Sequence, residues 1–323
     1  MLYYGKFVFR CLIMLYPAQS LPPISKISLD DWQLIKVSGV DNSKFLQGQL
    51  TADINELNDN HWLFSAHCDP KGKTLANLLI FKRHEDIYYL VRKSVVDIHL
   101  KELKKYAIFS KVSITIESSL SVLGLAGTEI NSQNLEALAT LTSQNNCHTV
   151  NNLTFVKIDF PTNRYLIIGT DEEIAEFIAP LSSITTLPAS QWALLDMQAN
   201  YPIIDAPVSH QFLPQAFNLQ QFAAISFTKG CYCGQEMVAR AQYRGINKRS
   251  LYLLIGEHAD SVEIGDTLEQ KLGDSWRETG CILASFVVNN QIWVQAILNN
   301  EIPESEATFR LKNNHQILTI INN

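Results

Sequence analysis

The sequence lacks several features that would identify a membrane or secreted protein. After residue 22 it has no uninterrupted run of the roughly 18 apolar residues that a membrane-spanning helix needs. It has no internal repeat and no low-complexity tract, and its 6 cysteines in 323 residues do not make a disulfide framework. We therefore expect reduced thiols, a cytoplasmic location and no membrane contact.

The chain also has no excess of positive charge. The chain has 26 Lys and Arg against 32 Asp and Glu, which gives a net charge of −6. This balance excludes a protein that is basic throughout and coats nucleic acid. Any contact with nucleic acid would have to use a local basic patch.

The N terminus resembles a secretory signal peptide only faintly. Arg10 interrupts the apolar run, and the stretch from Cys11 to Tyr16 is too short for the hydrophobic region of such a peptide. We expect Met14 to be the natural start and residues 1–13 to be an extension upstream of it. Residues 1–22 as a whole are expected to be disordered or a wrongly assigned N-terminal extension.

The rest of the chain predicts an α+β protein with two or three domains. Strands and helices do not alternate regularly, which favours antiparallel α+β parts over a doubly wound sheet. Five short strands after residue 248 predict an all-β barrel or sandwich. The expected parts are a first α+β part at 23–117, a second at 118–190, a return segment at 191–247 and the barrel at 248–323.

Hydrophobic periodicity and turn residues place the individual elements. Helices are predicted at 41–50, 94–106, 134–142, 171–179, 191–198 and 236–244. Strands are predicted at 27–37, on both sides of a turn at 69–73, and at 87–91, 111–116, 122–127, 154–160, 164–170, 250–256, 280–289, 291–298, 307–311 and 316–321.

The segment 228-TKGCYCGQEMVARAQYRG-245 has two cysteines one residue apart, just before a predicted helix. Here the Cys231 thiol would lie near the helix N terminus and Lys229, both of which stabilise a thiolate. Cys231 is therefore a candidate reactive thiol. The alternative is a small buried residue in a tight turn between glycines.

A self-contained metal site is not expected at this motif. A structural zinc site needs four ligands, commonly as C-x₂₋₄-C pairs, whereas Cys231 and Cys233 are spaced C-x-C without a second pair. His67 and Cys68 could contribute only if the fold brings them close. A disulfide between Cys231 and Cys233 would be strained.

The motif also reverses the sign of charge locally. Residues 229–249 contain five basic side chains and one acidic side chain, a net charge of +4. Such a patch suits a phosphate, a polyglutamate tail or an RNA backbone. The alternative is an ordinary solvated helix face.

Residues Lys229 to Glu236, KGCYCGQE, resemble the K-G-C-Y-x-G-Q-E signature of the YgfZ family of folate-binding, tRNA-modifying proteins. That family is related to the aminomethyltransferase, or T-protein, of glycine cleavage. The resemblance extends from about Ile27 to the C terminus. Further blocks that resemble the family, in the right order, are LDDW at 29–32, FLQGQLTAD at 45–53, AHCDPKGK at 66–73, LKKYAIFSKV at 103–112 and FLPQA at 212–216.

The resemblance implies a three-part ring like the aminomethyltransferase folate-binding fold, with a C-terminal β-barrel. It implies that tetrahydrofolate or another folate derivative binds in the central hole against Trp32 and Trp192. Stacking on a flat pteridine suits tryptophan, although core packing is the alternative for each indole. Because Cys233 occupies the variable position of the signature, the resemblance makes Cys231 the important thiol.

The implied function is tRNA modification by methylthiolation and maintenance of iron–sulfur enzymes, including a tRNA methylthiotransferase, with a regulatory role through tRNA modification. A monomer is expected, and direct contact with tRNA stays open. Cys231 and Lys229 would act in catalysis, if the protein is an enzyme, as a tetrahydrofolate-dependent one-carbon transferase. Supporting roles would fall to Gln235, Glu236, Arg240 and Arg244.

Two other functions stay open from the sequence. The first is a true aminomethyltransferase acting on a lipoyl carrier, although T-proteins lack the K-G-C-Y-x-G-Q-E block. The second is a non-catalytic RNA-binding or scaffold protein that uses residues 229–249 and needs no folate.

Overall fold

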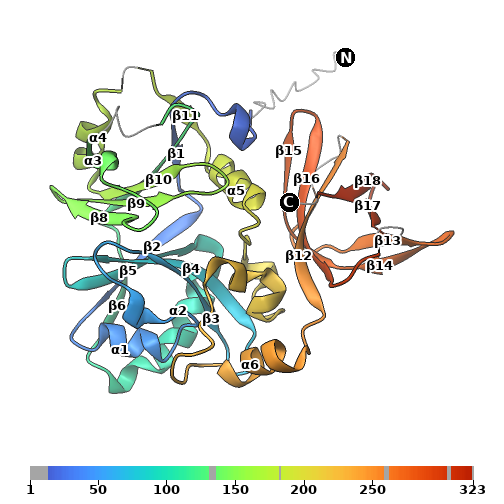
Figure 1. The fold of residues 1–323 in the computed structure, drawn as a ribbon, viewed down its shortest axis with the longest axis horizontal. Coiled ribbons are helices and arrows are strands. Elements are labelled where there is room, and N and C mark those ends of the chain that lie inside the picture. Colours follow the sequence, from blue (N-terminus) through green and yellow to red (C-terminus); the bar gives the residue numbers. More distant parts are fainter. Residues whose placement is uncertain (1–13, 131–135, 182, 258–261, 304–306, 322–323) are drawn as a thin grey trace, which may run out of the picture.

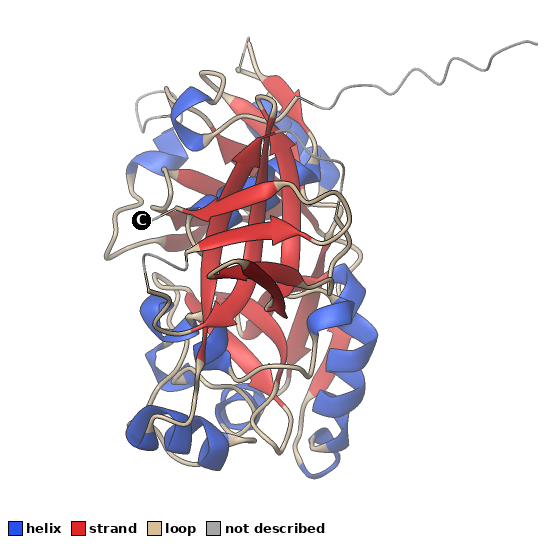
Figure 2. Ribbon diagram, turned by 90° about the vertical axis from the view of Figure 1, so that its right-hand side faces the viewer, coloured by secondary structure: helices blue, strands red, loops and turns tan. Residues whose placement is uncertain are grey.

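The computed structural model describes residues 14–323 except 131–135, 182, 258–261, 304–306 and 322–323. Two sheets with their helices form a body, and an all-β part lies beside it (Figure 1). Figure 2 shows the strands of this all-β part in front of the body. The predicted α+β architecture with a C-terminal β part is confirmed.

The first sheet has five antiparallel strands in the order β3-β4-β5-β2-β6. Strands β4 and β5 are buried on both faces, because one face packs under helices and the other faces the centre of the molecule. The elements are β2 (Trp32–Ser38), β3 (Leu63–Cys68), β4 (Thr74–Arg83), β5 (Asp86–Arg92), β6 (Ser113–Ile116), α1 (Asn42–Gln47) and α2 (Val96–Lys105).

The second sheet has six strands in the order β11-β1-β7-β10-β9-β8. Its strand β1 precedes β2, so the predicted strand 27–37 is in fact two strands that lie in different sheets. The elements are β1 (Ser25–Ser28), β7 (Ser121–Ala126), β8 (Cys147–Val150), β9 (Leu153–Ile158), β10 (Arg164–Gly169), β11 (Thr185–Leu187), α3 (Glu136–Ala139) and α4 (Asp171–Ile178).

Helix α5 (Ala189–Gln198) is buried along most of its length and joins the two sheets to the β part. Residues 14–22 of the expected N-terminal extension pack against it. The Tyr16 N–H donates to Gln191 Oε1, and Gln191 Nε2 donates to the Tyr16 carbonyl, both at 2.8 Å. Residues 1–13 lie outside the described part of the chain.

The C-terminal sheet has the strand order β14-β13-β17-β18-β12-β16-β15. It curls towards closure: the Gly265 N–H donates to the Ile282 carbonyl and the Ile282 N–H donates to the Asp266 carbonyl, both at 2.8 Å. Its strands are β12 (Arg249–Glu257), β13 (Leu268–Leu272), β14 (Ser275–Thr279), β15 (Cys281–Val288), β16 (Gln291–Asn299), β17 (Thr308–Leu311) and β18 (Ile317–Ile320). Within the described residues, no helix is long and apolar enough to span a membrane.

A buried pair of histidines lies between the first sheet and helix α2, with His67 on β3 and His99 on α2. The Nδ1 atoms of His67 and His99 are 3.0 Å apart, and His99 Nε2 is 2.7 Å from the Tyr89 hydroxyl. Burial lowers the pKa of His67 to about 4 and lowers the pKa of His99 well below its usual value. Both rings are therefore neutral at pH 7.

This pair should make the protein sensitive to acid. The pKa of His67 falls from 6.5 in the unfolded chain to about 4 on folding. Between these two pKa values only the unfolded chain takes up the proton, so the folded state loses stability as the pH falls from 6.5 to 4. We expect His67 to lower the free energy of unfolding by about 2 kcal/mol between pH 7 and pH 5.

Urea unfolding followed by circular dichroism at several pH values measures this effect. His67→Phe should flatten the pH dependence, whereas the exposed-site change His315→Gln should leave it intact. An identical pH slope in wild type and His67→Phe would contradict the assignment.

Candidate functional site

The cysteine motif forms a turn that packs between the end of α1 and the turn at 69–73. The Cys233 N–H donates to the Gly48 carbonyl at 3.1 Å, just after α1. Gly234 has φ +81°, and a Cβ there would lie 2.5 Å from the Asp69 carbonyl oxygen. The turn 69–73 therefore contacts the motif so closely that only glycine fits at position 234.

Helix α6 (Gln235–Arg244) follows the turn, as predicted, and ends at Gly245 in the left-handed conformation, with φ +59°. Gln235 Nε2 donates to the Gly230 carbonyl at 3.4 Å, which braces the turn. Glu236 pairs with Arg240 at 2.5 Å along the exposed helix face, and Arg244 is exposed in the last turn.

Lys229 is buried, and its ammonium group donates two hydrogen bonds to the backbone. Its Nζ donates to the carbonyls of Leu50 and Ala52, at 2.8 and 2.6 Å. Burial lowers the pKa of Lys229 to about 8, and the charge of Asp53 partly opposes this. Lys229 therefore ties the motif to the segment that follows α1.

The two motif cysteines have different surroundings. Cys231 is an exposed free thiol, whereas Cys233 is half-buried next to the Tyr106 hydroxyl. Burial raises the pKa of Cys233, which keeps this thiol protonated at neutral pH. Of the two cysteines, Cys231 is the more accessible to an incoming molecule.

His67 and Cys68 lie at the end of β3, next to the turn that contacts the motif. Both are fully buried, and burial raises the pKa of Cys68 far above its usual value. Among the described residues, no group of three or more His, Cys, Asp or Glu side chains is arranged to hold a metal ion.

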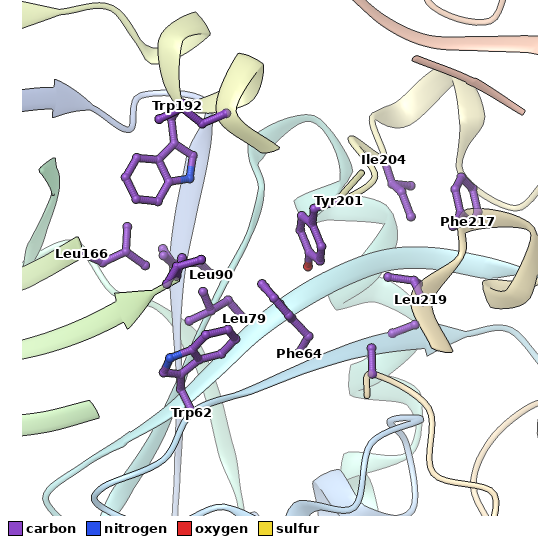
Figure 3. Close-up of a cluster of buried hydrophobic side chains, with 14 of the residues drawn as sticks. Trp62, Phe64, Leu79, Leu90, Leu166, Trp192, Tyr201, Ile204, Phe217 and Leu219 are labelled. Carbon is purple, nitrogen blue, oxygen red and sulfur yellow. The ribbon is translucent and has the colours of Figure 1, made fainter. Parts of the chain in front are cut away.

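A second candidate region lies between the two sheets, where an aromatic cavity forms under α5. Trp192 extends from α5 towards Leu166 and Leu90, with Tyr201 and Phe64 nearby (Figure 3). The complete lining is Leu29, Trp32, Phe64, Leu79, Leu90, Ile158, Leu166, Trp192, Asp196 and Tyr201. The structure therefore brings Trp32 and Trp192 together at one cavity.

Each of the two tryptophans has an arginine over its ring. The Arg164 Cζ is 4.5 Å from the Trp192 ring centroid, and the Arg92 Cζ is 5.5 Å from that of Trp32. Arg92 is fixed by two hydrogen bonds to the Asp205 carboxylate, at 3.2 and 3.0 Å. These cation–π contacts orient both indoles.

One carboxylate, Asp196, reaches the cavity from α5. Arg164 Nη2 donates to Asp196 Oδ1 at 2.6 Å, and both side chains are buried. Burial raises the pKa of Asp196, and Arg164 opposes this. The Tyr201 hydroxyl is also buried, near Asn77 but without a well-formed hydrogen bond.

The cavity is narrow and shares wall residues with a surface hollow on the Trp32 side. It leaves only about 10 Å³ for the centre of a water molecule. Trp32, Leu29 and Leu90 also line a surface hollow of about 330 Å³. A flat ligand of two fused rings would therefore have to displace rim side chains, and Trp32 is the half-exposed one of the two indoles.

The motif and the aromatic cavity are separate in the structure. Neither Lys229 nor Cys231 lines the cavity. Sequence reasoning did not single out Asp196, Arg164 or Tyr201. A signal was present for Asp196, because it follows Trp192 by four residues and therefore shares its helix face.

Known proteins resemble this chain both in sequence and in fold. Residues 247–314 match the family described as YgfZ, beta-barrel domain. The chain is 42% identical over 304 residues to the tRNA-modifying protein YgfZ of Yersinia enterocolitica (serotype O:8 / biotype 1B), covering 92% of this chain and 91% of that protein. It is 44% identical over 288 residues to that of Yersinia pseudotuberculosis (serotype O:1b), covering 88% and 87%.

Among solved structures, the fold is similar to the glycine cleavage system aminomethyltransferase T from Bartonella henselae. The TM-score is 0.74 at 12% identity, and the match covers 96% of this chain and 90% of that one. The predicted aminomethyltransferase-like fold is thereby confirmed. On its sequence identity to these relatives over most of its length, this chain belongs to the YgfZ family.

Proposed function

We propose that this protein binds a reduced folate in the aromatic cavity and acts in tRNA modification, by methylthiolation, in the cytoplasm. Its role there is to maintain iron–sulfur enzymes, including a tRNA methylthiotransferase. The observation that carries the proposal is the convergence of Trp32, Trp192 and Asp196 on one narrow cavity, with Arg164 paired to Asp196. The relatives named tRNA-modifying protein support the tRNA part of the proposal.

The cavity residues fit the chemistry of a pteridine. Trp32 and Trp192 offer aromatic faces for its flat rings, which stack with favourable quadrupole contacts. The Asp196 carboxylate can accept hydrogen bonds from the amino and ring N–H groups of a pteridine. The Tyr201 hydroxyl can donate or accept a further hydrogen bond. Bound tetrahydrofolate would supply a one-carbon carrier.

Cys231 takes the second role in this proposal. It is the accessible thiol of the motif, and it acts as a nucleophile or ligand towards a partner that approaches the surface. Lys229 fixes the turn that presents this thiol. Gln235 and the Glu236–Arg240 pair stabilise the first turns of α6 beside it.

Titration with tetrahydrofolate, followed by tryptophan fluorescence and calorimetry, tests the folate site. We expect saturable quenching in the wild-type protein. Trp32→Ala should raise the Kd by roughly 5- to 150-fold, because one stacking contact contributes about 1–3 kcal/mol. Trp276→Ala, on β14 of the C-terminal sheet, is the matched control and should bind as wild type.

Two results would overturn the proposal. One is the absence of any folate signal in the intact protein, which would favour the non-catalytic RNA-binding or scaffold function. The other is rapid turnover of an aminomethylated lipoyl carrier, which would make the protein a true aminomethyltransferase.

A further inference from the structure

A strongly basic surface surrounds the cysteine motif. It consists of residues 69–73, 96–111 and 229–249, and we call it the motif surface. These segments carry 11 Lys and Arg against 4 Asp and Glu, a net charge of +7 in a chain whose net charge is −6. The segments meet in space, because Gly234 contacts Asp69 and Cys233 contacts Tyr106. Figure 1 shows α1 and α6 along the lower edge of the molecule with α2 between them.

Aromatic side chains project from the same surface. The exposed fractions of Tyr106, Phe109 and Tyr243 are 41%, 95% and 71%. In the part of the chain that the structure describes, no other Phe, Tyr or Trp is classed as exposed. Leaving a large apolar side chain in water forgoes the favourable free energy of burial, and such clusters mark interaction sites.

Most acidic groups of the motif surface are already satisfied locally. They are Asp69, which accepts the N–H groups of Lys71 and Lys73, Glu102, which pairs with Lys105, and Glu236, which pairs with Arg240. By contrast, Lys104, Arg244 and Lys248 are exposed and form no ion pair with any described residue. The free charge that this surface presents is therefore positive.

We infer that the motif surface binds RNA directly, with phosphates on the basic side chains and unpaired bases stacked on Phe109 and Tyr243. Cationic side chains neutralise the phosphate backbone, and exposed aromatic rings stack on bases that are not paired. A protein partner would need an acidic apolar face, but the three aromatic rings among lysines and arginines match RNA better. The inference rests on the proposed role in tRNA modification, and it places the RNA beside the exposed Cys231 thiol.

Fluorescence anisotropy with a labelled transfer RNA and with a blunt RNA duplex of equal charge tests this inference. We expect the intact protein to bind the transfer RNA, and four phosphate contacts would weaken binding roughly 50-fold between 50 and 200 mM salt. Arg244→Glu with Lys248→Glu, at two exposed cations that form no ion pair with any described residue, should weaken the binding of both RNAs at least about ten-fold. Lys271→Glu with Arg277→Glu, on the β13–β14 hairpin, is the matched charge control and should bind as wild type.

The aromatic part has its own variant. The double variant Phe109→Ala with Tyr243→Ala should bind the transfer RNA about 5-fold or more weakly. Its affinity for the duplex should be unchanged. No measurable RNA binding, or equal binding by the charge-reversed and control variants, would overturn the inference. Folate titration of the same variants keeps the two proposals apart: normal folate binding with no RNA binding would reject only the RNA surface.

Discussion

In cells that lack the native protein, a Cys231→Ala variant should leave methylthiolated tRNA at the level of the empty vector. The Cys233→Ala variant should restore most of it. The reason is accessibility: Cys231 is exposed, whereas Cys233 is half-buried with a raised pKa and serves through its backbone N–H to Gly48. The exposed thiol is the more accessible of the two to a partner molecule.

This loss should occur without unfolding. An exposed side chain changes stability by less than about 0.5 kcal/mol when it is truncated, so Cys231→Ala should unfold in urea as wild type does. Its affinity for tetrahydrofolate should also be unchanged, because Cys231 does not line the aromatic cavity. Equal complementation by both alanine variants would remove the proposed role of the thiol.

The helices and most strands could be predicted from the sequence because their patterns are local. Helix α6 is an example, with a glycine turn before it and Gly245 after it. The hairpin of β13 and β14 was missed, since its residues are mostly polar and only partly buried and show no apolar alternation. The placement of β1 in the second sheet depends on distant pairing with β7 and β11, which no local pattern encodes.

In the candidate site, too, some features could be predicted from the sequence and others depend on distant contacts. The resemblance pointed to Trp32 and Trp192, and the structure places both at one cavity. Arg164 and Asp196 are 32 positions apart in the sequence, so tertiary packing decides that they pair with each other. The expected catalytic function of Lys229 could not be weighed from sequence, because the carbonyls that it contacts are nearly 180 positions away.

Substitution of Lys229 should strongly reduce the stability of the protein. We expect Lys229→Ala to lower the free energy of unfolding by about 3–5 kcal/mol, because two charge-assisted hydrogen bonds are lost and two buried carbonyls are left without donors. Lys229→Arg should not restore stability, since a planar guanidinium does not fit a pocket built around a compact ammonium. Urea denaturation followed by circular dichroism measures both, and the exposed-site variant Arg244→Ala should remain within about 0.5 kcal/mol of wild type.

The pH dependence of stability tests the burial of the Lys229 ammonium group. The pKa of Lys229 drops from 10.5 in the unfolded chain to about 8 on folding. The unfolded chain therefore holds the extra proton between these values, and Lys229 should make the folded state more stable as the pH rises through that window. Lys229→Met should lose this rise. If Lys229→Ala instead unfolded like wild type while complementation failed, Lys229 would be acting in the chemistry beside Cys231 and not as the anchor of its turn.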